Sequence, residues 1–597
     1  MAEAFMECPL KEMFEEAESF AELRHLLSQE PSPQVFVGLL LIFEEWKDRD
    51  SLELALVYTA QHLEHWPPKQ RFAHFSWIWP DFPNSEPVAE TFLVRAIHFD
   101  FFIESKDFHR IVECSLLENL WYMDFESCGL DDDAVILLAS SPHLTGLRDL
   151  FLNDNLIGDE GVKALANTEK FRFLERLDLS SNSFGSEGVN ALADSPYLSN
   201  LTVLSMTGGM FGDEEVSKLV HSSNLRHCKK LELTTSGDYH LTSLSLAAIA
   251  NSSELRGLEY LNLHHCRVTD SSVELLACSP NIVNLKELNL GLSGLNDASL
   301  ETLVSSEHIG HLEVLTVETT PVGSKGLTAL AHAKSMQHLH TLDLAFTQVE
   351  DEGIQALASS PYVKQLRNLM LSEAWITGES MCYIAQSPNM STLEHLYLTQ
   401  CGLSRDGLLA LATSAHLNSL ETLDIRSHGI ESAELIAFFE CVTLPRLCSL
   451  WFNHTTLEVM QAFEASQIAN QMKRVFFFGY MGDDAVKCLA QSPNFAGLEE
   501  IVFCFADFGI EGFKALLNTP HLQKLETLSI ALESDDPVEY SRELSEEWVT
   551  MLAQTKSFPK LNTLRFRTQM DREKCEKLLF ESEAFPELLD LDLDFPE

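Results

Sequence analysis

Histidine, cysteine and acidic side chains are the residues of this chain that could hold a metal ion or perform acid–base chemistry. The densest group is His264-His265-Cys266, three consecutive residues of types that bind metals. The thirteen cysteines include no C-x-x-C pair, and the chain has no G-x-S-x-G, G-x-x-x-x-G-K-S/T or H-E-x-x-H motif. Whether the three consecutive residues can converge on one ion depends on the elements that carry them.

Those elements follow a 27-residue period. Segments of the form L-x-x-L-x-L recur at this spacing, apart from one gap of 57 residues that a degenerate copy at Cys228 fills. Regular copies start at Leu147, Leu174, Leu201, Leu258, Leu285, Leu312, Leu339, Leu366, Leu393, Leu420 and Leu447, and weaker ones at Leu120, Met472, Leu498, Leu525, Leu561 and Leu588. Eighteen starts in one register indicate a repeat architecture.

One period predicts one strand and one helix. Residues 147–152 carry leucines at every second or third position, which is typical of a short strand with one buried face. Val162, Leu165 and Ala166 follow helical spacing, and Asp159 lies where a helix N-cap is expected. A Ser-Pro pair such as 195–196 then ends the helix.

This pattern resembles leucine-rich repeats, in particular the long, helix-containing kind found in ribonuclease inhibitor and in the Ran GTPase-activating protein. The resemblance covers residues 120 to about 595. It implies an α/β leucine-rich-repeat solenoid, a horseshoe with a parallel inner sheet, outer helices and about 18 repeats of 27 residues. No residue here can be matched in register to a catalytic loop of the GTPase-activating family, so we expect no enzymatic activity.

The resemblance also implies a role for Cys128, Cys266 and Cys401, which occupy the position held by Asn155, eight residues after the first leucine. In the family this position turns inward and hydrogen-bonds neighbouring loop backbone. Cys266 would then point into the core while His264 points to the concave surface. We therefore expect neither a metal site nor a cofactor.

The first 116 residues show no such register and form a separate predicted domain, with the solenoid spanning residues 117–597. Their pattern predicts helices over roughly Phe14–Leu27, Gln34–Trp46, Leu52–His65 and Ala89–Phe102. An α-helical cap would cover the apolar end of the first repeat, as a solenoid requires for solubility. The alternative is an independent recognition or effector module.

Strand alternation predicts which side chains face the concave side: those two, four, six and seven residues after each first leucine. Early copies form an acidic lip of Asp124, Glu126, Asp149, Asp154 and Asp178. Later copies supply partner-binding candidates: Tyr260, His264, His265, Phe346, Met370, His395, Tyr397, Trp451, His454, Phe476, Phe478 and Phe505, with Trp375 at a strand's exit. Exposed rows of large apolar side chains are typical of protein-binding sites. The irregular register around Phe476 and Phe478 leaves open whether a shifted strand buries them.

Charge narrows the choice of partner. The 41 basic and 90 acidic side chains give a formal net charge of −49. Nucleic acid is bound by neutralising phosphates with Lys and Arg, so this balance argues against it. The acidity favours a partner with a basic surface, but solubility or adaptation to high salt would explain it equally well. The N-terminus is acidic where a secretory signal is basic, and the longest apolar run, residues 35–43, is about half a bilayer span. We expect a cytoplasmic protein with no membrane ligand; its oligomeric state is open.

The leading hypothesis is a non-catalytic scaffold that grips a folded, basic protein partner on the concave face. Analogy with ribonuclease inhibitor suggests an inhibitor or immunity protein for a basic nuclease or toxin as an alternative. A third hypothesis makes the N-terminal helical domain an effector or adaptor and the repeats its targeting arm.

Overall fold

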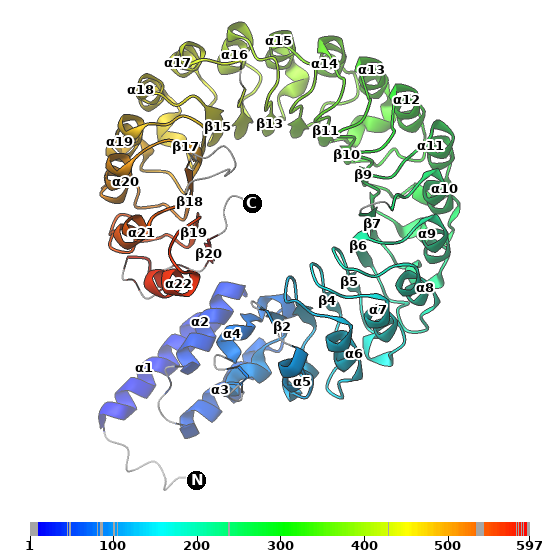
Figure 1. Cartoon of the computed structure of the whole chain (residues 1–597), viewed down its shortest axis with the longest axis vertical. Coiled ribbons are helices and arrows are strands. Elements are labelled where there is room, and N and C mark those ends of the chain that lie inside the picture. The colour runs from blue at the N-terminus through cyan, green and yellow to red at the C-terminus, as the bar shows by residue number, and fades with distance from the viewer. Residues whose placement is uncertain are drawn as a thin grey trace. The chain divides into compact units, whose positions relative to one another are not determined.

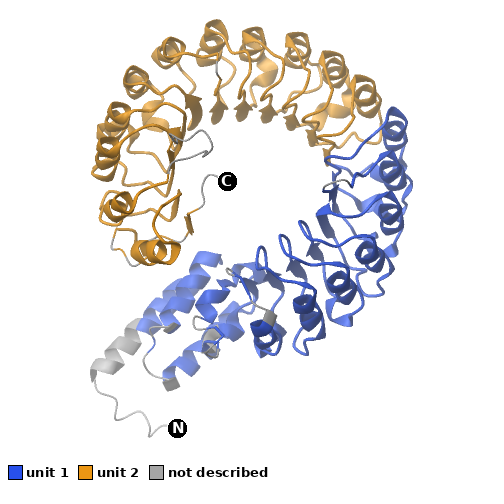
Figure 2. Ribbon diagram, in the orientation of Figure 1, with its two compact units in different colours: residues 1–285 blue, residues 286–597 orange. Residues whose placement is uncertain are grey.

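The computed structural model describes residues 10–44, 46, 49–79, 82–83, 87–99, 102–103, 105–236, 239–427, 429–532, 543–580, 582, 584–586, 588 and 590–593. The chain divides into two compact units, Met1–Leu285 and Lys286–Glu597, which are blue and orange in Figure 2. Within each unit the strands line the inner side of an arc and the helices its outer side, as Figure 1 shows. Each unit is an α/β solenoid of stacked strand-and-helix repeats.

The described residues of unit 1 form eight parallel strands. They are β1 Phe72–His74, β2 Ala96–His98, β3 Tyr122–Asp124, β4 Asp149–Phe151, β5 Arg176–Asp178, β6 Val203–Gly209, β7 Lys230–Thr235 and β8 Tyr260–Asn262. Its α-helices are α1 Leu10–Leu27, α2 Pro33–Glu44, α3 Arg49–Leu63, α4 Phe75–Ile78, α5 Ser105–Val112, α6 Asp132–Ser140, α7 Asp159–Ala166, α8 Ser186–Asp194, α9 Asp213–Val220, α10 Ser243–Asn251 and α11 Asp270–Ala277.

The described residues of unit 2 form twelve strands and eleven α-helices in the same pattern. Its strands are β9 Glu287–Asn289, β10 Val314–Thr316, β11 Thr341–Asp343, β12 Asn368–Met370, β13 His395–Tyr397, β14 Thr422–Asp424, β15 Ser449–Asn453, β16 Arg474–Phe478, β17 Glu500–Ala506, β18 Thr527–Leu532, β19 Thr563–Phe566 and β20 Asp590–Asp592. Its helices are α12 Asp297–Val304, α13 Ser324–His332, α14 Asp351–Ala358, α15 Gly378–Gln386, α16 Arg405–Ala412, α17 Ser432–Cys441, α18 Leu457–Ala465, α19 Asp483–Gln491, α20 Ile510–Leu517, α21 Glu546–Leu552 and α22 Arg572–Phe580.

The predicted repeat register is confirmed. Each strand from β3 to β20 begins two residues after one of the eighteen predicted starts. Equivalent leucines pair across neighbouring strands, as Leu150 does with Leu177, so the buried rows run continuously through each unit. Leu147, Leu150 and Leu152 are fully buried, because each strand presents them to the helix that follows.

The solenoid sheet begins earlier than the sequence predicted. Strands β1 and β2 lie within the segment expected to be only helical, and β2 pairs with both β1 and β3. The predicted helix Ala89–Phe102 is therefore wrong: a short 3-10 helix, Ala89–Leu93, leads directly into β2. Residues 94–99, V-R-A-I-H-F, lack the leucines of the motif, yet Ile97 and Phe99 are buried where those leucines lie in other repeats. The three other predicted helices correspond to α1, α2 and α3.

Asp159 does not cap its own helix, contrary to the prediction. Gly158 is the N-cap of α7, and Asp159 is the first helical residue. Its carboxylate accepts hydrogen bonds from the backbone N–H groups of Gly185, at 2.9 Å, and Gly188, at 2.7 Å, at the start of α8. Because glycine has no side chain to cap with, a carboxylate of the preceding repeat satisfies the free amides.

This inter-repeat cap, an aspartate at a helix start that bonds the start of the next helix, recurs in both units. The aspartates that make it are Asp132, Asp159, Asp213, Asp297, Asp351 and Asp483. In a solenoid each repeat contacts only its neighbours, so these bonds contribute directly to the interfaces that hold the repeats in register.

Candidate partner-binding surface

The face of the sheet that no helix covers carries side chains of alternate strand positions. In β13, for example, Leu396 is buried against the helices while His395 and Tyr397 are half-buried on the other face. Parallel pairing without a shift places Met370 beside Tyr397 and Trp451 beside Phe476. Equivalent residues of neighbouring repeats therefore meet in rows, about 4.8 Å apart along the sheet.

One such row, in unit 2, gathers large aromatic rings around an arginine. We call this group the Trp451 cluster; it comprises Tyr397, Asp424, Arg426, Trp451, Phe476 and Phe478. The Trp451 ring lies 4.2 Å from the Phe476 centroid, 6.2 Å from the Tyr397 centroid in an edge-to-face arrangement, and 6.3 Å from the Phe478 centroid. Aromatic pairs at these separations contribute favourable energy beyond their buried area.

The pairing of β16 decides on which face of the sheet Phe476 and Phe478 lie. Strand β16 pairs with β15 in continuous register, so both rings share the face of Trp451, whereas Phe477 between them is fully buried. No shifted strand hides the two rings.

Arg426 holds the cluster together. Its guanidinium carbon lies 4.7 Å from the Trp451 ring centroid and 4.2 Å from that of Phe478, which are cation–π distances. The same guanidinium donates hydrogen bonds to Asp424, at 2.9 Å from Nε to Oδ1 and 2.6 Å from Nη2 to Oδ2. Asp424 is fully buried and also accepts a 2.6 Å bond from the Thr399 hydroxyl. The buried carboxylate thus fixes the guanidinium plane between two rings.

Sequence reasoning missed Asp424 and Arg426. They occupy the fourth and sixth positions after Leu420, which are predicted concave positions, but only aromatic residues, methionine and histidine were predicted to bind a partner there. A charged pair two residues apart on the same strand face, beside rows of aromatics, was the available signal.

Two observations concern the polar groups of the cluster and of the neighbouring His395. Burial raises the pKa of the Tyr397 phenol; the Arg474 charge opposes this by a smaller amount, and the Asp424 charge adds the smallest raising effect. Among the described residues, Trp451 Nε1 and His395 Nδ1 are buried polar atoms without a hydrogen-bond partner. Such unpaired groups are uncommon in folded proteins.

Other predicted residues of unit 2 lie at the rim of the sheet. Phe346, His454 and Phe505 adopt positive φ angles of 56°, 58° and 56°. Phe346 and His454 follow the ends of β11 and β15, whereas Phe505 lies within β17, where its pairing with β18 shifts register. Phe346 and Trp375 are strongly exposed, at 52% and 61%. A positive φ costs free energy for residues other than glycine, so the backbone at Phe346, His454 and Phe505 is strained.

Tyr260 and His264 belong to unit 1 and take no part in the Trp451 cluster. The Tyr260 ring lies 4.4 Å from the Lys230 ammonium, and the backbone N–H of His264 donates to the Asn262 side chain. His265, at the rim, packs edge-to-face on His240 at 4.8 Å. The structure thus divides the predicted aromatic row into separate groups.

The acidic lip, also in unit 1, is partly neutralised by the protein itself. Asp149 is buried and pairs with Arg176 at 2.5 Å. Asp124 lies 3.2 Å from His98 and accepts a 3.1 Å bond from the Tyr122 hydroxyl. The other three members are not paired in this way. Glu126 and Asp154 are exposed, and Asp178 is half-buried with a pKa raised by burial and by the Glu232 charge.

The cysteine of the His264-His265-Cys266 segment lies in the core. Cys266 is buried, with Sγ 3.5 Å from the Thr242 carbonyl oxygen, and burial raises its pKa to about 12. Cys128 and Cys401 likewise donate to backbone carbonyls of the preceding repeat, at 3.1 and 3.0 Å. In the part of the chain that the structure describes, no three His, Cys, Asp or Glu side chains are grouped to hold an ion.

Comparison with known proteins identifies the class of the repeats. Four segments, residues 143–166, 172–193, 335–358 and 389–412, match the family model described as Leucine Rich repeat. These segments are leucine-rich repeats, and they lie within α/β solenoids of stacked strand-and-helix repeats. No curated protein matches it. Within the described residues, no helix is both long and apolar enough to cross a membrane.

Three solved structures illustrate the similarity. An internalin from Listeria monocytogenes is 17% identical, with 61% of this chain and 83% of that chain covered and a TM-score of 0.32. The Rad7 and Elc1 complex in yeast is 15% identical, with 59% and 83% covered and a TM-score of 0.37. The TLR13–ssRNA13 complex is 15% identical, with 84% and 65% covered and a TM-score of 0.33. These values carry no conclusion about a partner.

Proposed function

We propose that the chain is a non-catalytic scaffold that binds a folded protein partner on the helix-free face of unit 2, with the Trp451 cluster as the anchor. The observation that carries this proposal is the composition of the cluster: Trp, Tyr and Arg are the residues enriched at binding hot spots. They stand in a row on the one sheet face that the helices leave uncovered.

The partner is proposed to carry a basic surface. The chain has a formal net charge of −49, and Glu126, Asp154 and Asp178 of the acidic lip have no basic side chain paired with them among the described residues. Charges of this kind accelerate encounter with an opposite charge and are screened by salt. The Arg426 charge, by contrast, is already balanced by Asp424, so the cluster itself supplies shape and apolar contact.

Helices α1 to α3 are proposed to act as the cap of the first repeat. Helix α2 packs against β1, the first strand, and Phe36 and Phe43 of this helix are buried. A cap of this kind keeps the apolar end of a solenoid from water. Because β2 lies within residues 1–116 and pairs with β3 beyond them, we expect that fragment alone to be insoluble.

The proposal is tested in two steps with Trp451→Ala and Tyr397→Ala. Their matched controls are Trp77→Ala and Tyr362→Ala, exposed aromatics that lie outside the cluster. Quantitative affinity purification from the native cell type should show a partner lost with the cluster variants and retained with both controls. Equal recovery with all four variants would contradict the role of the cluster.

Kinetics with the purified partner then separate the two contributions. Loss of a hot-spot tryptophan, at about 2 kcal/mol or more, raises the dissociation rate about 30-fold. Added salt should lower the association rate and leave the dissociation rate of the wild type nearly constant. An association rate that does not change with salt would contradict steering by the acidic lip. Thermal melts of each variant would reveal any general loss of fold.

A further inference from the structure

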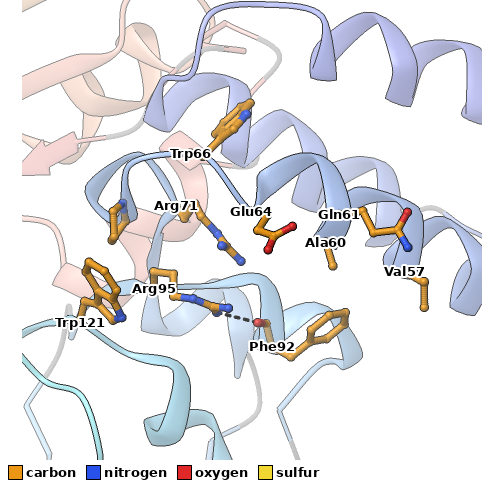
Figure 3. Close-up of a pocket in the computed structure, with 10 residues that line it drawn as sticks. Val57, Ala60, Gln61, Glu64, Trp66, Arg71, Phe92, Arg95 and Trp121 are labelled. Atoms are coloured by element: carbon orange, nitrogen blue, oxygen red, sulfur yellow. Dashed lines mark hydrogen bonds between the residues drawn. The ribbon is translucent and has the colours of Figure 1, made fainter.

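A pocket in unit 1 has no role in the binding surface described above. It has a volume of about 500 Å³ and lies between α3, the 3-10 helix Ala89–Leu93 and the start of β3. Figure 3 shows the side chains that define its character: Glu64, Trp66, Arg71, Phe92, Arg95 and Trp121. Its walls are largely apolar, and its volume falls within the range of small-molecule sites.

Two guanidinium groups point into this space. Arg71 is buried, with 6% of its surface exposed, and Arg95 is half-buried. Neither forms an ion pair with any carboxylate among the described residues, although acidic side chains outnumber basic ones by more than two to one in the chain. Buried charges without a counter-charge are costly and therefore uncommon.

The backbone positions both guanidiniums but leaves most of their donors unused. Arg71 donates from Nε to the Leu93 carbonyl, at 2.7 Å, and from Nη1 to the Leu63 carbonyl, at 3.4 Å. Arg95 donates twice from Nη1, to the carbonyls of Phe92 and Val94, each at 2.8 Å. A guanidinium has five N–H groups, so about three remain on each residue for another acceptor.

The electrostatics of Arg71 and Arg95 favour the binding of an anion. Burial, followed by the neighbouring Arg95 charge, lowers the pKa of Arg71 to about 10, and burial also lowers that of Arg95. Both residues stay positively charged near neutral pH and repel each other. A bound anion would relieve the repulsion and accept the unused N–H groups in charge-assisted hydrogen bonds.

From this geometry we propose that the pocket binds a small organic anion, with a carboxylate or phosphate group on Arg71 and Arg95 and an aromatic body against Trp121 and Phe92. Trp121 and Phe92 are 41% and 39% exposed, so they offer apolar surface that a flat ring can cover. Glu64 also lines the pocket and repels negative charge, so a ligand with a small negative charge is favoured.

Isothermal titration calorimetry on the full chain tests the proposal with four probes: 2-naphthoate, 2-naphthyl phosphate, neutral 2-naphthamide and inorganic phosphate. At least one of the two organic anions should bind about tenfold more tightly than the amide and than inorganic phosphate, since each control lacks one half of the recognised chemistry. Comparison of the two organic anions distinguishes a carboxylate from a phosphate ligand.

Variants assign the binding to the pocket. Arg95→Gln should weaken binding of the organic anion about tenfold, and Glu64→Gln should strengthen it, whereas Arg226→Gln, an exposed arginine elsewhere in unit 1, should leave it unchanged. Trp121→Ala should also weaken it, which gives a second test if Arg95→Gln perturbs the fold. Equal binding of the amide and the anions, unchanged affinity in Arg95→Gln, or no binding of either organic anion would overturn the proposal.

Discussion

Replacing Asp351 by alanine will remove an inter-repeat cap in unit 2 and loosen α15 from α14. The Asp351 carboxylate accepts backbone N–H groups of Thr377, at 2.9 Å, and Ser380, at 3.2 Å. It also accepts the two hydroxyl groups of the same residues, at 2.7 and 2.5 Å. All four donors belong to the start of the next helix, so one truncation breaks the whole connection between the two helix starts.

The expected loss follows from these bonds. A helix cap contributes about 1 kcal/mol, and bonds to a charged acceptor contribute about 1.5–3 kcal/mol where they are buried. Asp351 is partly exposed and the freed hydroxyls can turn to water, so we expect a total of about 2.5 kcal/mol. For residues 286–597 unfolding as one cooperative body, this corresponds to a fall in melting temperature of about 4 °C.

Thermal melts followed by circular dichroism measure this fall. Asp351→Asn keeps an acceptor but loses the charge, and should lose about half as much. Glu352→Gln is the matched control: it removes a charge from the same helix start at an exposed residue, and should shift the melt by less than about 1 °C. Equal shifts for Asp351→Ala and Glu352→Gln would refute the idea that the aspartate joins the repeats.

The same cap predicts a pH dependence. Burial would raise the pKa of Asp351, but the hydrogen bonds from Ser380 and Thr377 together outweigh it and lower the pKa. Its stabilisation is therefore fully present above the unfolded-state pKa, about 4, and is lost as pH falls through the lower folded-state value. The difference in melting temperature between wild type and Asp351→Asn should be constant from about pH 8 to 5 and shrink below about pH 4.

Three further predictions concern the core. Asn155→Ala will leave the Leu130 N–H unbonded, remove one of the hydrogen bonds to the Phe125 carbonyl and cost about 3 kcal/mol, seen as a lower melting temperature of the full chain; a shift below about 1 °C would contradict this. Arg426→Met will destabilise the protein by about 3 kcal/mol because it strands the buried Asp424 carboxylate, and Asp424→Asn in the same chain should recover most of that loss in the same melts; no recovery would show that ring packing dominates. Iodoacetamide at about pH 8 should label the exposed Cys278 and spare the buried Cys401, whose pKa burial raises to about 12; equal labelling by mass spectrometry would contradict the buried role.

The sequence predicted the periodic part of the fold because leucine spacing and burial have the same cause. Repeat starts identified in the sequence, such as Leu420, predict the first residue of the following strand, here β14, because the leucines of the motif are the positions that face the helices. Strand β2 was missed because the buried residues in and beside it, Val94, Ile97 and Phe99, fit a helix as well as a strand in isolation. Pairing with β1 and β3 decides between them.

The candidate site was only half predictable. Alternation along a strand placed Tyr397 and Trp451 on the helix-free face, because side-chain direction is a local property of extended backbone. That Arg426 stacks on Trp451 while bound to Asp424 depends on which repeats are neighbours and on the rotamers that packing allows. The pocket around Arg71 and Arg95 is of the same kind, since α3 contributes walls from far outside the repeat register.

The amino-acid sequence by itself determined the repeat length, the buried leucine rows and the face on which each strand residue lies, because each follows from residue spacing and from the alternation of side chains along a strand. Only the tertiary structure decided which carboxylate caps which helix, which rings gather around Arg426 and where two arginines share a pocket. Those arrangements join side chains from different repeats or from the N-terminal helices, and their distances follow from packing and not from spacing along the chain.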